Sequence, residues 1–375
     1  MTNDLPRVLP NPGRRPGPRP APASGGGPDP SAFHRRLPGY ATTPLHDAPT
    51  LAARLGVGRL SVKDESHRLG LPSFKILGAS WATYRLLTER LGHEPDWTDV
   101  ADLRTALAPL GALTLVAATD GNHGRAVAHM ASLLGYAAEI LVPAGTADAR
   151  ITAIEGEGAR VTVVDGTYDD AVAASAALAA DDALVVSDTS WPGYSTVPRW
   201  VIDGYATIFA EVAAQTTGAP PDVVMVPMGV GALTAAAVEH APPDAAVVAV
   251  EPIDAACGLA SAAAGHPVEV PGPHRSIMAG LNCGNVSEIA WPIVHAGVDV
   301  FVAVTDPAAE AAMRDLAAIG VVAGETGAAG LAGLAALTET PVPALDLAGA
   351  HVLIIVTEGA TDPVGYARIV GTTPG

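Results

Sequence analysis

Basic residues are scarce in this sequence. Lysine and arginine together number 21 against 39 aspartates and glutamates, and the formal net charge is −18 at pH 7. A chain this acidic repels phosphodiester backbones, and outside the N-terminal tail no run of Lys or Arg forms a basic stripe. We therefore expect no nucleic-acid partner.

Cysteine and long apolar runs are also missing. Cys257 and Cys283 form neither a disulfide framework nor a metal-ligand spacing, so they predict buried reduced thiols and no metal site. Asp, Gly or Pro interrupts the apolar stretches well before the roughly 20 residues of a membrane span, and the amino terminus lacks the apolar core of a signal peptide. These absences predict a cytoplasmic protein with no membrane partner.

Apolar residues are plentiful, and they suffice for two lobes. They make up 49% of the 375 residues, a length beyond the ~250–300 residues at which a single core stops growing. Residues 1–30 are rich in Pro and Gly and cannot bury enough apolar area to offset the entropy of ordering, which predicts a disordered tail. Its arginines could contact a partner subunit.

Beyond the tail, β-like runs alternate with Ala-rich helical runs, a pattern typical of parallel sheets in α/β proteins. We predict two doubly wound lobes, the smaller (residues 81–196) nested in a larger cofactor-binding domain (residues 31–80 and 197–375). The predicted strands of the smaller lobe are Leu113–Thr119, Ala138–Pro143, Arg160–Asp165 and Leu184–Asp188, and those of the larger are Val223–Pro227, Ala246–Glu251, Val298–Thr305 and His351–Thr357.

The first chemical motif is Ser73-Phe74-Lys75-Ile76-Leu77-Gly78. Lysine is rare in this chain, and Lys75 is flanked by apolar residues at the junction of a polar loop and a predicted helix. A desolvated lysine has a lowered pKa, as formation of a Schiff base and a later proton transfer both require. We predict that Lys75 is a reactive amine rather than a surface residue.

The second motif, Thr119-Asp120-Gly121-Asn122-His123-Gly124, closes a predicted strand and opens a helix. The carboxyl ends of parallel strands are where open α/β sheets bind ligands. Gly121 and Gly124 would let the backbone approach a ligand closely, and Asn122 can hydrogen-bond a phenolic oxygen. Asp120 is either a carboxylate of the site or a helix cap.

The third motif, Met228-Gly229-Val230-Gly231-Ala232, again joins a strand to a helix, and its backbone N–H groups could ring a phosphate. Position 234 is Thr, so the longer glycine pattern of dinucleotide sites fails and a nicotinamide dehydrogenase is disfavoured. An amine, an Asn-bearing loop and a phosphate cradle, in this order, indicate pyridoxal 5'-phosphate. Downstream, Thr357 could face the pyridine nitrogen and Glu325 could support the ring, although strand-end capping explains either residue equally well.

With these motifs, the sequence from about Leu60 to Pro363 resembles the fold-type II (tryptophan synthase β-like) pyridoxal phosphate enzymes and, within them, the diaminopropionate ammonia-lyase family. Threonine dehydratases and serine racemases typically carry Ser where this chain has Asp120. Further matches are Tyr168-Asp169-Asp170, Asp188-Thr189-Ser190-Trp191, Gly193-Tyr194, Gly204-Tyr205, Ile277-Met278-Ala279-Gly280-Leu281 and Gly324-Glu325-Thr326-Gly327.

The resemblance implies that Lys75 and Asp120 flank the substrate α-carbon from opposite faces, so that the α-proton of either enantiomer can be removed. It also implies α,β-elimination of ammonia from 2,3-diaminopropionate, or a related β-substituted amino acid, to give pyruvate and ammonia. The expected cofactor contacts are Phe74, Lys75, Asn122, Gly229, Val230, Gly231, Ala232, Glu325 and Thr357. The expected substrate contacts are Thr119, Asp120, Gly121, His123, Tyr168, Asp188 and Met278.

Several alternatives share this chemistry. A β-replacement synthase, a threonine or serine dehydratase and an amino-acid racemase all fit the same motifs, and the departures at Ala79, Ser195 and Ala360 from the family pattern leave the β-substituent open. A catalytically silent regulatory protein would be expected to lose Lys75 or Asp120, and both are present. We expect a homodimer whose partner is otherwise only a small amino-acid substrate.

Overall fold

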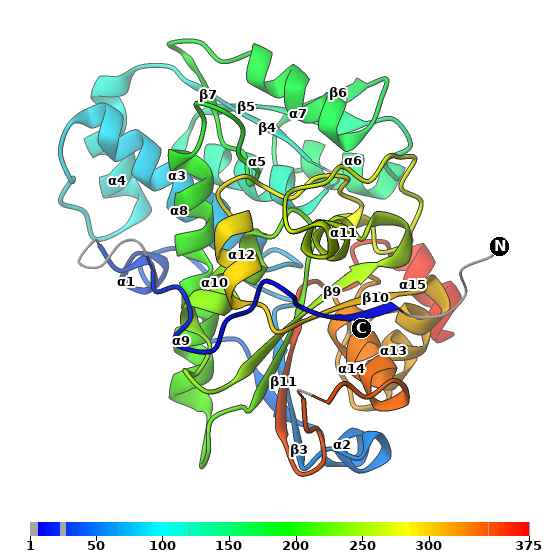
Figure 1. The fold of residues 1–375 in the computed structure, drawn as a ribbon. Helices are drawn as coiled ribbons and strands as arrows, with labels where there is room; N and C mark the ends of the chain where they lie inside the picture. Colours follow the sequence, from blue (N-terminus) through cyan, green and yellow to red (C-terminus); the bar gives the residue numbers. More distant parts are fainter. Residues whose placement is uncertain (1–6, 23–27, 120, 344, 375) are drawn as a thin grey trace. The chain divides into compact units, whose positions relative to one another are not determined.

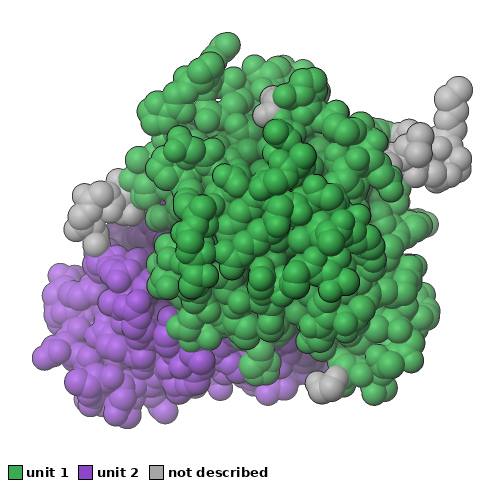
Figure 2. All heavy atoms as spheres, turned by 90° about the horizontal axis from the view of Figure 1, so that it is seen from below, with its two compact units in different colours: residues 1–25, 42–67, 208–375 green, residues 26–41, 68–207 purple. Residues whose placement is uncertain are grey.

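The computed structural model of the protein describes residues 7–22, 28–119, 121–343 and 345–374. The chain divides into two compact units, coloured green and purple in Figure 2: unit 1 comprises residues 1–25, 42–67 and 208–375, and unit 2 comprises residues 26–41 and 68–207. In the sequence, unit 2 is therefore inserted into unit 1, and the structure differs from the predicted boundaries at 80/81 and 196/197. The reason is that helix α3 (Lys75–Leu91) runs through the first boundary and packs against α8 (Thr196–Gly204).

Unit 1 is built on a sheet in which seven strands are found among the described residues. The inner strands are parallel, and the strand at each edge is antiparallel to its neighbour. In spatial order the strands are β1 (Arg7–Pro10), β10 (Val300–Val304), β9 (Ala246–Pro252), β8 (Val223–Pro227), β11 (His351–Val356), β3 (Arg59–Asp64) and β2 (Leu45–Asp47).

Helices cover both faces of this sheet, which explains why its central strands are apolar without alternation. On one face α14 (Ala329–Glu339) packs against β8, β9, β10 and β11, and the hydrophobic core extends outward to α13 (Asp306–Ala318) and α15 (Pro363–Val370), drawn in orange and red in Figure 1. Helix α10 (Ala232–His240) also packs on β8 and β9. Every residue of β8 and β11 is buried.

Unit 2 contains a parallel sheet of four strands among its described residues, in the order β6 (Arg160–Val164), β5 (Ala137–Pro143), β4 (Thr114–Ala118) and β7 (Ala183–Val185). Helix α5 (Asn122–Leu134) and helix α7 (Tyr168–Ala177) both pack on β4 and β5, and α3 packs on α5. The two predicted doubly wound sheets are therefore confirmed, with strand ends within a few residues of those expected.

The remaining helices connect these layers. They are α1 (Pro30–His34), α2 (Pro49–Leu55), α4 (Val100–Leu107), α6 (Asp148–Glu155), α9 (Ala206–Gln215), α11 (Cys257–Ala264) and α12 (Trp291–Gly297). Across the part of the chain that the structure describes, no helix combines the length and apolar character needed to cross a membrane.

The N-terminal segment differs from the predicted disordered tail of residues 1–30. Residues 1–6 and 23–27 lie outside the described residues, but Arg7–Pro10 form β1, which pairs antiparallel with β10. The prediction rested on local composition, whereas the partner strand lies almost 300 residues further along the chain. Segment 7–22 is consequently part of unit 1.

Candidate active site

Lys75 is the first residue of α3, as the loop-to-helix junction in the sequence predicts. Its Nζ atom lies 5.5 Å from the ring centroid of Phe74, and Phe74 in turn packs on Tyr205 with ring centroids 4.7 Å apart. The only other lysine, Lys63, is fully buried and pairs with Glu211 at 2.7 Å, so it serves the core of unit 1. Lys75 is therefore the lysine positioned for chemistry.

Among the described residues, a buried carboxylate from the segment after β7 pairs with Lys75. Nζ of Lys75 donates to Oδ2 of Asp188 at 2.6 Å, and the hydroxyl of Tyr168, the first residue of α7, donates to Oδ1 at 3.1 Å. Burial alone raises the pKa of Asp188, but the charge of Lys75 and the hydrogen bonds from Lys75 and Tyr168 hold that pKa well below its ordinary value. Asp188 is consequently an anion with an ammonium group already bound to it.

Tyr194 fixes the segment that carries Asp188, a role the sequence did not reveal. Its hydroxyl donates to the carbonyl of Val185 at 2.8 Å and accepts from the N–H of Ser187 at 3.1 Å, while its ring stacks on Trp191. Burial raises the pKa of Tyr194, so the phenol stays protonated and can donate. The Gly193-Tyr194 pair in the sequence was the available signal.

His123 lies beside this carboxylate on α5. Its Nε2 atom is 2.8 Å from the carbonyl of Val186, which fixes the proton on Nε2, and its Nδ1 atom is 3.9 Å from Oδ2 of Asp188. Burial lowers the pKa of His123. Nδ1 has no hydrogen-bond partner among the described residues, so a neutral imidazole offers an acceptor next to the Lys75–Asp188 pair.

The turn from β4 into α5 has the geometry of a ligand-binding loop. Gly121 has φ +152°, a conformation that favours glycine, and its N–H donates to the Thr119 hydroxyl at 2.8 Å, so Thr119 shapes the turn. Asn122 begins α5, whose N-cap residue is Gly121 and so contributes no capping side chain. Asp120 lies outside the described residues.

Gly124, in contrast, has a packing reason to be glycine that the sequence did not show. A Cβ atom there would lie 2.4 Å from Cγ2 of Thr119 and 2.5 Å from Cγ2 of Ile140. Glycine is needed at this position because α5 packs closely on β4 and β5.

In unit 1, the glycine loop between β8 and α10 forms a cradle. Gly231 is the N-cap of α10 with φ +97°, and within the described residues this N-cap position supplies no side chain that accepts from the helix start. A Cβ atom on Gly229 would lie 3.1 Å from the carbonyl oxygen of Gly280 and 3.2 Å from Sγ of Cys283. Val230 and Ala232 are buried. The backbone N–H groups of this loop are therefore available to bind an anion. We call residues Gly229–Ala232 the cradle.

Thr357 and Glu325 also lie in unit 1, both buried. Thr357 follows β11, and its Oγ1 atom finds no hydrogen-bond partner within the described residues. Such a hydroxyl, buried at a cost unless bonded, suits a bound acceptor such as a pyridine nitrogen. Gly324 and Gly327 pack against Glu358 and Gly359, which brings the two motifs that bear Glu325 and Thr357 together.

Met278 is placed differently from the expected substrate contact. Its side chain is fully buried in the hydrophobic core cluster that includes Met225 and Leu331. An apolar side chain gains more from that burial than from lining a polar amino-acid site. Cys257 and Cys283 are buried as predicted, and within the described residues no group of three or more His, Cys, Asp or Glu side chains is arranged to hold a metal ion.

Tyr205 is a further residue that the sequence did not single out beyond its motif. It is fully buried over the first turn of α3, where a Cβ atom on Gly78 would lie 2.7 Å from its ring. Burial raises the pKa of Tyr205, and the charges of Lys75 and Asp188 also act on it. Its ring therefore forms part of the wall that holds Lys75 in place.

Comparison with known proteins gives a consistent result. Residues 36–358 match the family described as pyridoxal-phosphate dependent enzyme. The sequence is 36% identical over 368 residues to the diaminopropionate ammonia-lyase of Salmonella typhimurium, covering 90% of each chain. It is 37% identical over 357 residues to that of Escherichia coli K12, covering 90% of this chain and 89% of the relative.

Solved structures of the E. coli enzyme are also similar. The complex with D-serine superposes with a TM-score of 0.88 and 34% identity, covering 97% of this chain and 96% of that one. The complex with an aminoacrylate-PLP azomethine reaction intermediate has a TM-score of 0.87 and 33% identity, covering 98% and 97% of the two chains.

Proposed function

This chain belongs to the pyridoxal-phosphate dependent enzyme family, and on that premise we propose that it is a lyase that eliminates ammonia from 2,3-diaminopropionate and yields pyruvate. The curated relatives that match over nine-tenths of the chain bear that activity in their names. The cofactor is pyridoxal 5'-phosphate. What the residues of the site do follows from their contacts.

The observation that carries the proposal is the Lys75–Asp188 pair. Asp188 is a buried anion that already binds one ammonium group at 2.6 Å and receives a second donor from Tyr168. A carboxylate held in this way is matched to the β-ammonium group of diaminopropionate, because charge-assisted hydrogen bonds are the strong ones in a buried site. A β-ammonium group held there leaves as neutral ammonia and needs no further proton, whereas a β-amine bound in its neutral form takes one proton, for which the hydroxyl of Tyr168 and the ammonium of Lys75 are the donors at that carboxylate.

The residues present fit the cofactor. In unit 2, Lys75 supplies the amine for its aldehyde, Asn122 is proposed to meet its phenolic oxygen and Phe74 supports Lys75. In unit 1, the uncapped cradle offers N–H donors to a phosphate, the unpartnered hydroxyl of Thr357 offers a donor to a ring nitrogen, and Glu325 is proposed to support the ring. When bound, pyridoxal phosphate draws electrons away from the substrate α-carbon.

Two groups are proposed to move the α-proton. Lys75, once it releases its proton, is a base at one face of the substrate, and Asp120 is proposed as the base at the other. Neutral His123 offers Nδ1 as an acceptor beside Asp188. Thr119 and Gly121 shape the turn between β4 and α5, and this turn is proposed to meet the substrate carboxylate.

The proposal is tested with purified holoenzyme and each enantiomer of diaminopropionate. Wild type should form one pyruvate and two ammonia for each molecule of diaminopropionate consumed. Lys75→Ala should lose the protein–cofactor link that borohydride reduces, and Asp120→Asn should lose roughly 10²–10⁴-fold in turnover of one enantiomer only. Lys63 is the internal control for labelling, because it is the only other lysine.

Three results would count against the proposal. Borohydride labelling at Lys63 would show that Lys75 is not the lysine that links the protein to the cofactor. Conversion of D-serine or L-threonine with no turnover of diaminopropionate would assign the chain to a dehydratase, and a proton exchange without pyruvate would assign it to a racemase. We further propose a cytoplasmic homodimer, which light scattering and cell fractionation would test.

A further inference from the structure

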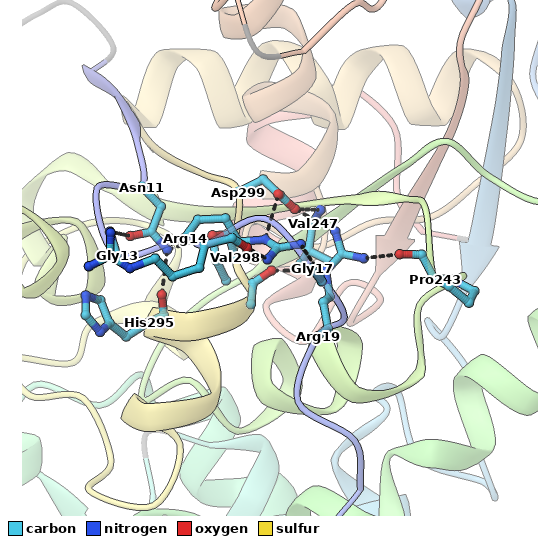
Figure 3. A network of polar contacts seen from close by, with 12 residues as sticks. Asn11, Gly13, Arg14, Gly17, Arg19, Pro243, Val247, His295, Val298 and Asp299 are labelled. Carbon is cyan, nitrogen blue, oxygen red and sulfur yellow. Dashed lines mark hydrogen bonds and ion pairs between the residues drawn. The ribbon is translucent and has the colours of Figure 1, made fainter.

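The N-terminal segment is tied to unit 1 by a network of side-chain contacts centred on Asp299 (Figure 3). Nε of Arg14 bonds Oδ1 of Asp299 at 3.0 Å, and Nη2 of Arg19 bonds Oδ2 at 2.7 Å. The N–H of Val247 donates to the same Oδ2 at 2.8 Å. Two arginines thus share one carboxylate, which lies immediately before β10.

The same segment also satisfies the carboxyl end of α12. The side-chain amide of Asn11 donates to the carbonyls of His295 at 2.8 Å and Val298 at 2.6 Å, and Nε of Arg19 donates to that of Gly297 at 3.1 Å. The last carbonyls of a helix have no partner within the helix, so outside donors are needed to fix this end. Residues 11–19, which we call the clamp, supply them.

The other end of α12 lies against the cradle. The N–H of Ser287, just before the helix, donates to the carbonyl of Val230 at 2.9 Å. A Cβ atom on Gly231 would lie 3.3 Å from Cβ of Ala290, the residue that precedes α12. The backbone and the side chains at this end therefore limit where the cradle can lie.

Along its length α12 packs on α10, the helix that begins at the cradle. Gly297 has no space for a side chain, because a Cβ atom there would lie 2.1 Å from Cγ1 of Val238. Contact this close leaves α12 little freedom to shift unless α10 and the cradle shift too. The clamp, α12, α10 and the cradle are thus joined by direct contacts within unit 1.

We propose that the clamp is a positioning element that sets the affinity of the cradle for the phosphate of the cofactor by fixing α12. The inference rests on the proposed assignment of the cradle as the phosphate site. Residues 11–19 do not touch the phosphate themselves; they hold the helix whose other end shapes the loop that does.

The experiment compares two ligands on the apoenzyme: pyridoxal phosphate and pyridoxal, which has the aldehyde but no phosphate. Their dissociation constants are measured by absorbance titration for wild type, for Arg14→Ala/Arg19→Ala and for Asp299→Asn. Both variants should bind pyridoxal phosphate about tenfold more weakly, within the 5- to 150-fold range typical of coupling between sites. Pyridoxal affinity should stay within twofold of wild type.

A matched control is Arg54→Ala, which breaks the Arg54–Asp315 pair on the surface of unit 1 between α2 and α13. It should leave both dissociation constants unchanged. Equal weakening toward both ligands, or unchanged affinity for pyridoxal phosphate, would refute the proposal. Should the double variant fail to fold by circular dichroism, Asn11→Ala takes its place with the same expected result, because it removes the bonds to the carbonyls of His295 and Val298 together with the bond from Gly13 N–H.

The failure of the clamp and the failure of the cradle are distinguishable. If Gly231→Asp abolishes binding of pyridoxal phosphate while the clamp variants bind it normally, the cradle stands and the clamp proposal is wrong. If Gly231→Asp binds it as tightly as wild type, the cradle assignment itself is wrong.

Discussion

Removal of the Thr357 hydroxyl should change the stability of the protein in opposite directions in the apo and the cofactor-bound state. Thr357 is 2% exposed, and its Oγ1 atom has no hydrogen-bond partner among the described residues. Burying an unpartnered hydroxyl costs about 1–3 kcal/mol in proteins. Thr357→Val replaces the hydroxyl by a methyl group of nearly the same size, so it should stabilise the apoprotein by that amount.

The expected shift in melting temperature follows from the chain length. At about 2.1 cal/mol/K per residue, 375 residues give an unfolding entropy of roughly 0.8 kcal/mol/K, so 1 kcal/mol corresponds to ~1.3 °C. The apoprotein should therefore melt about 1–4 °C higher. With the cofactor bound, the variant loses one hydrogen bond of about 0.5–1.5 kcal/mol. Added to the gain of the apoprotein, this weakens the binding free energy by about 1.5–4.5 kcal/mol, so the dissociation constant of pyridoxal phosphate should rise at least roughly tenfold.

Differential scanning fluorimetry with and without cofactor, together with absorbance titration, measures both quantities. Thr83→Val is the matched control, because Thr83 is a fully buried threonine of α3 whose Oγ1 is likewise unpartnered among the described residues. Thr83→Val should stabilise the protein and leave the affinity for the cofactor unchanged. Thr357→Ser retains the hydroxyl, so it should also retain the wild-type affinity for the cofactor. A lower apo melting temperature or an unchanged dissociation constant for Thr357→Val would refute the reasoning.

Two further predictions concern the cradle and the carboxylate. Gly231→Asp should weaken binding of pyridoxal phosphate at least tenfold in absorbance titration, because it strains a φ of +97° and sets a negative charge against a phosphate; full cofactor occupancy after dialysis would contradict this. Asp188→Asn should cost roughly 3 kcal/mol at pH 7, because it leaves the Lys75 ammonium without its carboxylate. The pKa of Asp188 is lowered in the folded protein, so its contribution to stability is present above about pH 4 and is lost as the pH falls toward the lower folded value. Urea denaturation between pH 2 and pH 7 should therefore show a flatter acid limb for the variant, and parallel curves would count against the ion pair.

Much of the fold could be predicted because its signals are local. β8 was predicted at Val223–Pro227 and occupies those residues, since a continuous apolar run bounded by polar and glycine-rich segments has few other solutions. Lys75 at the start of a helix and the cradle between strand and helix were predictable for the same reason.

The features that the sequence did not reveal depend on partners far along the chain. Lys75 and Asp188 are 113 positions apart, and nothing local in either motif indicates a direct ion pair. The motif around Gly124 suggests a ligand contact, but Ile140 on β5 lies so close that only glycine fits at this position. Residues 7–22 have the composition of a disordered segment, but Asp299 and the carbonyls after His295 supply contacts that composition cannot show.

The antiparallel pairing of β1 with β10 also has a consequence for the order in which the chain assembles. Asn11 and Val298 are 287 positions apart. At ~5–20 residues synthesised per second, the first strand leaves the ribosome roughly 15–60 s before its partner exists. The whole inserted unit, residues 26–41 and 68–207, is synthesised within that interval. We therefore expect the N-terminal strand to be the first part of the sheet translated and among the last to dock, so that it closes the edge only when the rest of unit 1 has been made.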